Sequence, residues 1–117
     1  MKHRTLAGSL KDAFQGVFFA IRHERNMAFH LIAAALALAA SLYYQIDRLE
    51  LLFVFSAIFL VILTEMFNTA LEKLVDLQTR EYHPLAKIAK SVAAGAVLCA
   101  AFFAVVVAYL VFGKRMW

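Results

Sequence analysis

The hydrophobic positions of this chain fall into three long runs, and each run predicts a membrane-spanning helix. The runs cover residues 27–46, 51–71 and 91–112. About 20 helical residues cross the roughly 30 Å hydrocarbon core of a bilayer, so each run is long enough. The first run carries no charge beyond a possible one on His30, and the third carries none. We therefore expect a single domain over residues 1–117 that contains three transmembrane helices.

An amphipathic segment precedes the three runs. Over residues 5–22, apolar side chains recur at helical spacing, while Lys11, Asp12 and Gln15 occupy the other face. This pattern is typical of a helix that lies in the membrane interface. A short core helix is the weaker alternative, because the chain has no water-soluble core for it to join. The predicted fold class is an all-α membrane protein with one surface helix and three spans.

Composition and charge agree with a membrane protein and suggest its orientation. The chain is 64% hydrophobic and 17% charged, with a net charge of +4. Basic residues gather before the first run and between the second and third runs, which places these segments and the N-terminus in the cytoplasm and the C-terminus outside.

A nucleic-acid partner is not expected, because no basic patch is interleaved with exposed aromatic residues. The single cysteine, Cys99, excludes a disulfide within the chain. The basic residues on the cytoplasmic side are Lys2, Arg4, Lys11, Arg22, Arg25, Lys73, Arg80, Lys87 and Lys90.

Small residues recur at intervals of four in the first and third runs, which lets helices approach closely in lipid. Contact between protomers and packing within one protomer explain this spacing equally well. The residues are Ala33 and Ala37, Ala35 and Ala39, and Ala96, Ala100 and Ala104.

A polar strip follows one face of the second predicted span, which we expect to continue as a helix to about Gln78. An ionised carboxylate deep in a bilayer costs about 2.5–3.5 kcal/mol, so such a strip indicates a functional site. If Leu51 marks the outer boundary, the strip begins about 21 Å deep and reaches the cytoplasmic interface. A lipid headgroup can meet a water-soluble reactant there. The strip consists of Glu65, Asn68, Glu72 and Asp76, whose spacing of three, four and four residues puts them on one helix face.

The chemistry of these residues leaves two kinds of function open. The sequence has no phosphate-binding glycine loop, no Cys/His cluster with zinc spacing and no arguable Ser-His-Asp set. The strip suits phosphoryl transfer, with Glu72 and Asp76 near a divalent cation, Lys90 on phosphate and Glu65 as a general base at a lipid hydroxyl. It suits proton-coupled transport equally well, because a lone intramembrane glutamate can cycle a proton.

Residues 65–76 resemble a family signature. They read E-M-F-N-T-A-L-E-K-L-V-D and are similar to the pattern E-x-x-N-x-A-x-E-x-x-V-D of the prokaryotic diacylglycerol kinase family. Residues 81–83, 86–90 and 93–97 match the family as well. Residues 24–30 are similar to the undecaprenol kinase branch of the Gram-positive type. The resemblance covers nearly the whole chain.

The resemblance implies a homotrimeric integral-membrane kinase of the bacterial inner membrane, with active sites shared between protomers. It implies transfer of the γ-phosphate of ATP to a lipid hydroxyl in the presence of Mg²⁺. By matching position, Glu65 is the general base, Glu24 and Glu72 are the magnesium ligands, and nucleotide or phosphate contacts come from Asn68, Asp76 and Lys90.

One position departs from the family pattern. The family usually has Ala-Lys-Asp where this chain has Ala-Lys-Ser, ending at Ser91. A serine can form a hydrogen bond but carries no charge. We therefore place Ser91 among the nucleotide contacts and expect weakened or altered nucleotide use, with a catalytically silent relative as the minority alternative.

The segment 24–30 and the run His83-Pro-Leu-Ala-Lys87 favour undecaprenol as the acceptor, with diacylglycerol as the alternative. A small proton-coupled transporter is the alternative from another class. Such transporters resemble four-span bundles with one deep glutamate, whereas this chain has three spans and a strip that reaches the interface.

Overall fold

The structure is a computed structural model that describes residues 5–116, apart from the side chain of Arg25. Within this range the secondary structure consists of four helices, which confirms the predicted all-α fold class. Three of them are long and apolar enough to cross a membrane. Lys2 and Arg4, used above to predict orientation, lie outside the described residues. The helices are α1 (Leu6–His23), α2 (Arg25–Tyr44), α3 (Arg48–Gln78) and α4 (Pro84–Met116).

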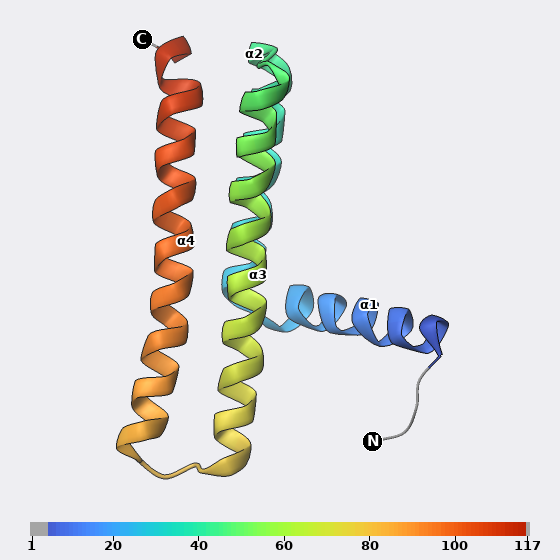
Figure 1. The fold of residues 1–117 in the computed structure, drawn as a ribbon, viewed down its shortest axis with the longest axis vertical. Helices are drawn as coiled ribbons and strands as arrows, with labels where there is room; N and C mark the ends of the chain where they lie inside the picture. The colour runs from blue at the N-terminus through green and yellow to red at the C-terminus, as the bar shows by residue number, and fades with distance from the viewer. Residues whose placement is uncertain (1–4, 117) are drawn as a thin grey trace.

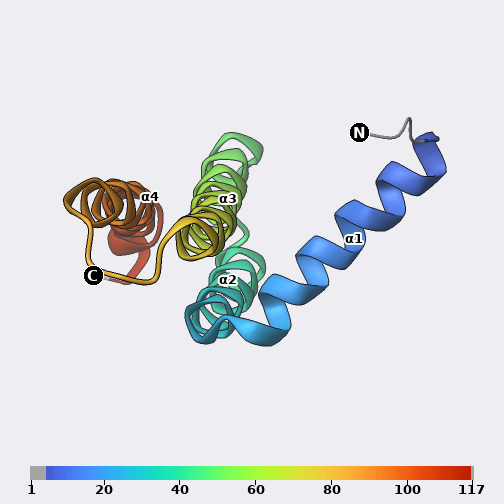
Figure 2. The same cartoon turned by 90° about the horizontal axis from the view of Figure 1, so that it is seen from below.

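Helix α1 runs away from the other three helices, which stand side by side (Figures 1 and 2). It begins after Thr5, whose Oγ1 accepts a hydrogen bond from the Gly8 N–H at 3.0 Å and so caps the helix. Its large apolar side chains, among them Leu6, Phe14 and Phe18, are exposed. An uncovered apolar face on a helix of this kind fits a place in the membrane interface.

A tight turn joins α2 to α3 and makes them an antiparallel hairpin. Gln45 closes α2 in the left-handed conformation, with φ of 50°. Asp47 then caps α3: its Oδ1 accepts from the Glu50 N–H at 2.8 Å, and its own N–H donates to Glu50 Oε1 at 3.5 Å. This reciprocal capping box fixes where α3 starts.

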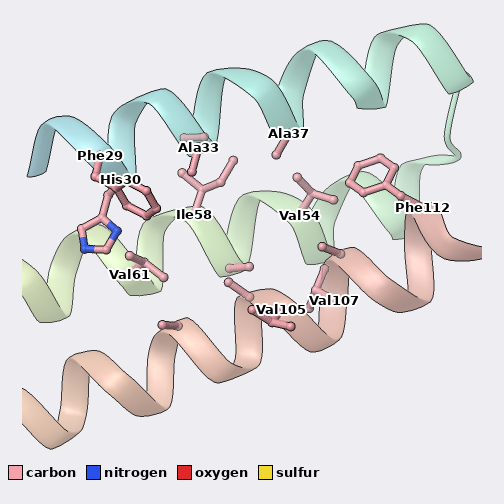
Figure 3. A pocket seen from close by; sticks show the side chains of 15 residues that line it. Phe29, His30, Ala33, Ala37, Val54, Ile58, Val61, Val105, Val107 and Phe112 are labelled. Atoms are coloured by element: carbon pink, nitrogen blue, oxygen red, sulfur yellow. The ribbon is translucent and has the colours of Figure 1, made fainter. Parts of the chain in front are cut away.

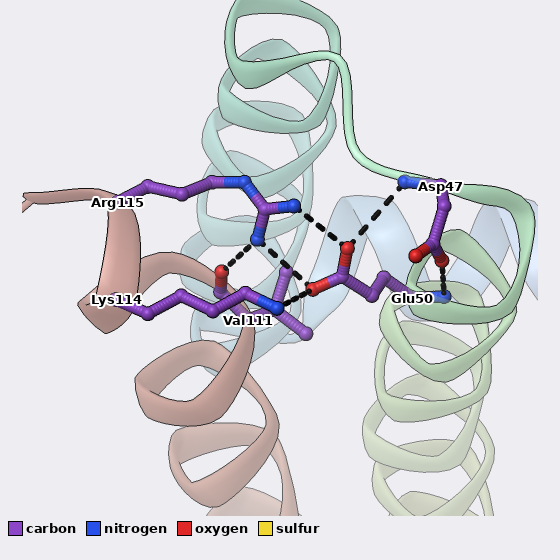
Figure 4. A network of polar contacts seen from close by, with 5 residues as sticks. All are labelled: Asp47, Glu50, Val111, Lys114 and Arg115. Atoms are coloured by element: carbon purple, nitrogen blue, oxygen red, sulfur yellow. Dashed lines mark hydrogen bonds and ion pairs between the residues drawn. The ribbon is translucent and has the colours of Figure 1, made fainter.

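An ion cluster ties the start of α3 to the end of α4 (Figure 4). Arg115 donates from Nη2 to Glu50 Oε1 at 2.8 Å and from Nη1 to Glu50 Oε2 at 2.9 Å. Lys114 Nζ lies 3.0 Å from the same Oε2. No pattern in the sequence predicted that these basic residues pair with Glu50.

Helices α3 and α4 are longer than a bilayer core requires. Their 31 and 33 residues correspond to about 46 and 50 Å at 1.5 Å per residue. Helix α3 ends at Gln78, as the sequence predicted, and α4 starts at Pro84, whose missing N–H suits a first helical turn. The ends that meet at the loop 79–83 extend past the level of α1 (Figure 1).

The buried core lies between α3 and α4 near the end that carries the ion cluster. Val54, Ala57, Val107, Val111 and Phe112 form it, and α2 packs against it with Ala37, Ala40 and Tyr44. Most other large apolar side chains are exposed, as expected for helices that face lipid.

The small residues divide between two environments. Ala100 is buried and Ala104 is half-buried, so these two pack within the chain. Ala35, Ala39 and Ala96 are exposed. Packing within one protomer therefore explains part of the spacing, and contact between protomers stays a prediction for the exposed part.

Candidate active site

Glu65 lies in α3 and is almost completely buried, with 2% of its surface exposed. Its nearest described basic group is on another helix: His30 Nε2 of α2 lies 3.6 Å from Glu65 Oε2. The Glu65 backbone carbonyl accepts a hydrogen bond from Thr69 Oγ1 at 3.0 Å, which leaves the carboxylate itself to other partners. A buried carboxylate is costly unless it is paired, and His30 is the basic side chain that the described residues bring within 4 Å of it.

One turn further along α3, Asn68 and Glu72 form a side-chain pair. Asn68 Nδ2 donates to Glu72 Oε1 at 3.1 Å. Asn68 Oδ1 is buried, and it finds no hydrogen-bond partner in the described part of the chain. The unpartnered Asn68 amide oxygen and the neighbouring Glu72 carboxylate are hard oxygen ligands of the kind that Mg²⁺ prefers.

Asp76 and Lys90 connect α3 to α4. Lys90 Nζ donates to Asp76 Oδ1 at 2.7 Å, and both side chains remain about half exposed. Asp76 lies beyond the apolar run that ends at Leu71, in the part of α3 that extends past the predicted span. There the hydrogen bond from Lys90 holds the pKa of the Asp76 carboxyl below its ordinary value. The carboxylate is therefore ionised at neutral pH, and the lysine is held at a fixed place.

These charged residues line one pocket of about 490 Å³ at the loop end of α3 and α4. Glu72, Asp76, Lys90 and Ser91 contribute to it, together with the loop residues Thr79 to His83. Four of the residues predicted to bind nucleotide or metal are thus brought together. The sequence was not read as placing loop residues in this pocket. The available signal was that the loop directly follows the polar face of α3.

Glu24 is not brought into this pocket. It lies at the junction of α1 and α2, where its backbone N–H donates to Ala20 O and its own carbonyl accepts from the Met27 N–H. Its side chain is half-buried and makes no capping hydrogen bond. Among the residues that the structure describes, no three His, Cys, Asp or Glu side chains gather into a metal cluster. Mg²⁺ commonly takes only one or two carboxylates and completes its shell with water and substrate phosphates, so the donors on α3 fit such an ion.

The arrangement therefore divides into two parts along one face of α3. A buried carboxylate lies beside apolar surroundings, and a charged, open pocket lies at the helix end. Such a site can bring an apolar alcohol and a charged phosphate donor to one helix face.

Comparison with known proteins agrees with this arrangement. The sequence profile of the family described as "Prokaryotic diacylglycerol kinase" matches residues 11–112. A protein named "Undecaprenol kinase" from Bacillus subtilis (strain 168) is 38% identical over 108 residues, which cover 92% of this chain and 88% of the relative. A "Diacylglycerol kinase" from Synechocystis sp. is 39% identical over 100 residues, 85% of this chain and 57% of the relative. A "Diacylglycerol kinase" from Escherichia coli (strain K12) is 33% identical over 75 residues, 64% of this chain and 62% of the relative.

Three apolar helices with a buried carboxylate and a charged pocket fit a membrane-embedded enzyme of phosphoryl transfer. The chain belongs to the prokaryotic diacylglycerol kinase family and is a lipid kinase. This membership favours the kinase hypothesis over the transporter hypothesis.

Proposed function

We propose that the protein transfers the γ-phosphate of ATP to the hydroxyl of undecaprenol at the cytoplasmic face of the bacterial inner membrane. The observation that carries the proposal is the continuity of one helix face. Buried Glu65 and the pocket residues Glu72 and Asp76 lie on the same face of α3. A membrane alcohol approaches from the apolar side and a nucleotide from the aqueous side.

In the proposed reaction, Glu65 is the general base. The hydroxyl oxygen of the acceptor attacks the γ-phosphorus, the bond to the β-phosphate oxygen breaks, ADP leaves, and the hydroxyl proton passes to the Glu65 carboxylate. Burial at 2% exposure keeps bulk water from competing for this position.

The remaining residues bind and orient the nucleotide. Lys90, held by Asp76 at 2.7 Å, supplies a positive charge for the phosphates, while Asn68 and Ser91 contribute hydrogen bonds. Glu24 and Glu72 are the proposed ligands of Mg²⁺. The unpartnered Asn68 Oδ1 supports a cation beside Glu72, whereas Glu24 lies outside the pocket within this chain, so its part in the proposal rests on the family resemblance. When bound, Mg²⁺ neutralises phosphate charge during the transfer.

Undecaprenol is favoured over diacylglycerol by the extent of similarity. The match to the undecaprenol kinase spans 92% of this chain and 88% of that protein, whereas the match to the Escherichia coli diacylglycerol kinase spans 64% and 62%. Diacylglycerol is the second candidate, and it is supported by the 39% identity to the Synechocystis protein.

The proposal includes the orientation of the chain in the membrane and its assembly into a homotrimer. The N-terminus and the loop 79–83 face the cytoplasm, and the C-terminus faces outside. The exposed residues Ala35, Ala39 and Ala96 offer surfaces for close helix contact in a homotrimer with shared sites.

An acceptor competition tests the proposed substrate. Purified protein in mixed micelles receives labelled ATP, Mg²⁺ and equal amounts of undecaprenol and diacylglycerol, and the two lipid products are separated. We expect label mainly in undecaprenyl phosphate. A preference for diacylglycerol would move the assignment to the second candidate, and label in neither product would make Ser91 the first position to revert to the family aspartate.

A further inference from the structure

His30 belongs neither to the family signature at residues 65–76 nor to the charged pocket at the loop end of α3 and α4. It belongs to the second turn of α2, yet its Nε2 lies 3.6 Å from Oε2 of Glu65 on α3. The imidazole is mostly buried, with 16% of the side chain exposed. Two buried ionisable groups from different helices therefore face each other at the depth where the proposed proton transfer takes place.

His30 also lines an apolar groove of about 280 Å³ between α2, α3 and α4 (Figure 3). The other lining residues are alanines, aliphatic residues and phenylalanines, so His30 is the one polar side chain among those that line the groove. Figure 3 places it at one end, near Val61 and Phe29. A polar ring in an apolar lining needs a polar partner, and the partner that the structure offers is the Glu65 carboxylate.

Neighbouring polar residues on α3 do not hold that carboxylate. Thr69 Oγ1 donates to the backbone carbonyl of Glu65, and Asn68 Nδ2 donates to Glu72. Side chains on the same helix are thus engaged elsewhere, whereas His30 approaches from across the helix interface. A catalytic base is commonly oriented by a third group in this way.

We propose that His30 is a positioning residue for Glu65, a role that rests on the proposed function. With the proton on Nε2, the ring donates to Oε2, fixes the rotamer of the carboxylate, and leaves its second oxygen for the hydroxyl proton of the acceptor. The observed 3.6 Å exceeds a hydrogen bond. Such contacts are often long without substrate and shorten in the reactive complex.

The test compares variants of His30 by their kinetic constants. His30→Leu keeps an apolar side chain of moderate size but has no donor, and His30→Gln keeps an N–H donor of similar reach. We expect His30→Leu to lower kcat about 10- to 100-fold, the cost of a misplaced reacting group, with KM for ATP and for undecaprenol within about twofold of the wild type. His30→Gln should recover kcat to within about fivefold. Val105→Ala, which changes the lining of the same groove from α4, is the control and should leave kcat unchanged.

The outcomes separate this proposal from the proposed function. One combination of results would overturn the positioning role alone. In it, the wild type transfers phosphate, Glu65→Gln does not, and the kcat of His30→Leu stays within threefold of the wild type. Equal losses in His30→Leu and His30→Gln, or a loss confined to KM for undecaprenol, would also overturn it. If His30→Leu does not fold, His30→Asn replaces it: this variant keeps the donor with a shorter reach, and a kcat no lower than that of His30→Gln would refute the role. Absence of transfer by the wild type to either lipid would overturn both proposals.

Discussion

Replacement of Glu65 by glutamine changes one oxygen of a buried carboxylate to an amide nitrogen and leaves the size of the side chain almost unchanged. At 2% exposure, the site has little access to water that could serve as a substitute base. A general base contributes about 10²- to 10⁴-fold to a rate, which corresponds to about 2.7–5.4 kcal/mol of transition-state stabilisation. We expect kcat of Glu65→Gln to fall by about 10³-fold, within that range. Burying a neutral amide costs less than burying a charge, so the fold should not be weakened.

The assay is steady-state transfer of labelled phosphate to undecaprenol, together with ATP binding by the same preparations. Lys90 and Asp76 are unchanged in this variant, so KM for ATP should stay within about twofold of the wild type. Glu50→Gln makes the same chemical change at the opposite end of α3 and is the matched control, assayed well below its unfolding temperature. A Glu65→Gln kcat within fivefold of the wild type would refute the base assignment. Loss of ATP binding or of thermal stability together with the rate would instead indicate a structural role.

Three further predictions concern other polar and charged residues. Lys90→Gln should raise KM for ATP by about tenfold or more, because the proposed charge-assisted contact to phosphate is lost. A titration of the rate with ATP measures this KM, and an unchanged value would exclude Lys90 from the nucleotide site. Ser91→Asp should raise kcat/KM for ATP if serine is a handicap, whereas a loss would mean that the pocket has adapted to serine. Glu50→Gln should lower the unfolding temperature in detergent, because Arg115 and Lys114 then face each other without their shared carboxylate. The effects of Glu50→Gln and Arg115→Gln should be less than additive in the double variant, and full additivity would show that the pair is not coupled.

The helices were predictable because their signals are local. Apolar runs of 20 residues or more, the polar strip that ends at Asp76 and the proline at position 84 predict the spans and the loop without any knowledge of packing. The orientation of the strip on one face follows from helical geometry in the same way, so Glu72 and Asp76 were placed correctly relative to each other. Their shared pocket with Lys90 depends in addition on how α4 packs against α3.

Contacts between helices were harder to foresee, since they depend on register. The partners Glu50 and Arg115 are 65 positions apart, and no local pattern connects them. The contact between His30 and Glu65 had a usable signal: counted from Ile46 in the turn, the two residues lie 16 and 19 positions away, so an antiparallel hairpin brings them to nearly the same depth.

The most direct test of the central claim follows the origin of the phosphate in the lipid product. Purified protein in mixed micelles with undecaprenol and Mg²⁺ receives ATP labelled at the γ-phosphate, or, in a parallel sample, at the α-phosphate. The account predicts label in the extracted lipid from γ-labelled ATP only, and predicts its near absence with Glu65→Gln. Wild-type protein that is folded and binds ATP, yet leaves the lipid unlabelled in both samples, would contradict it.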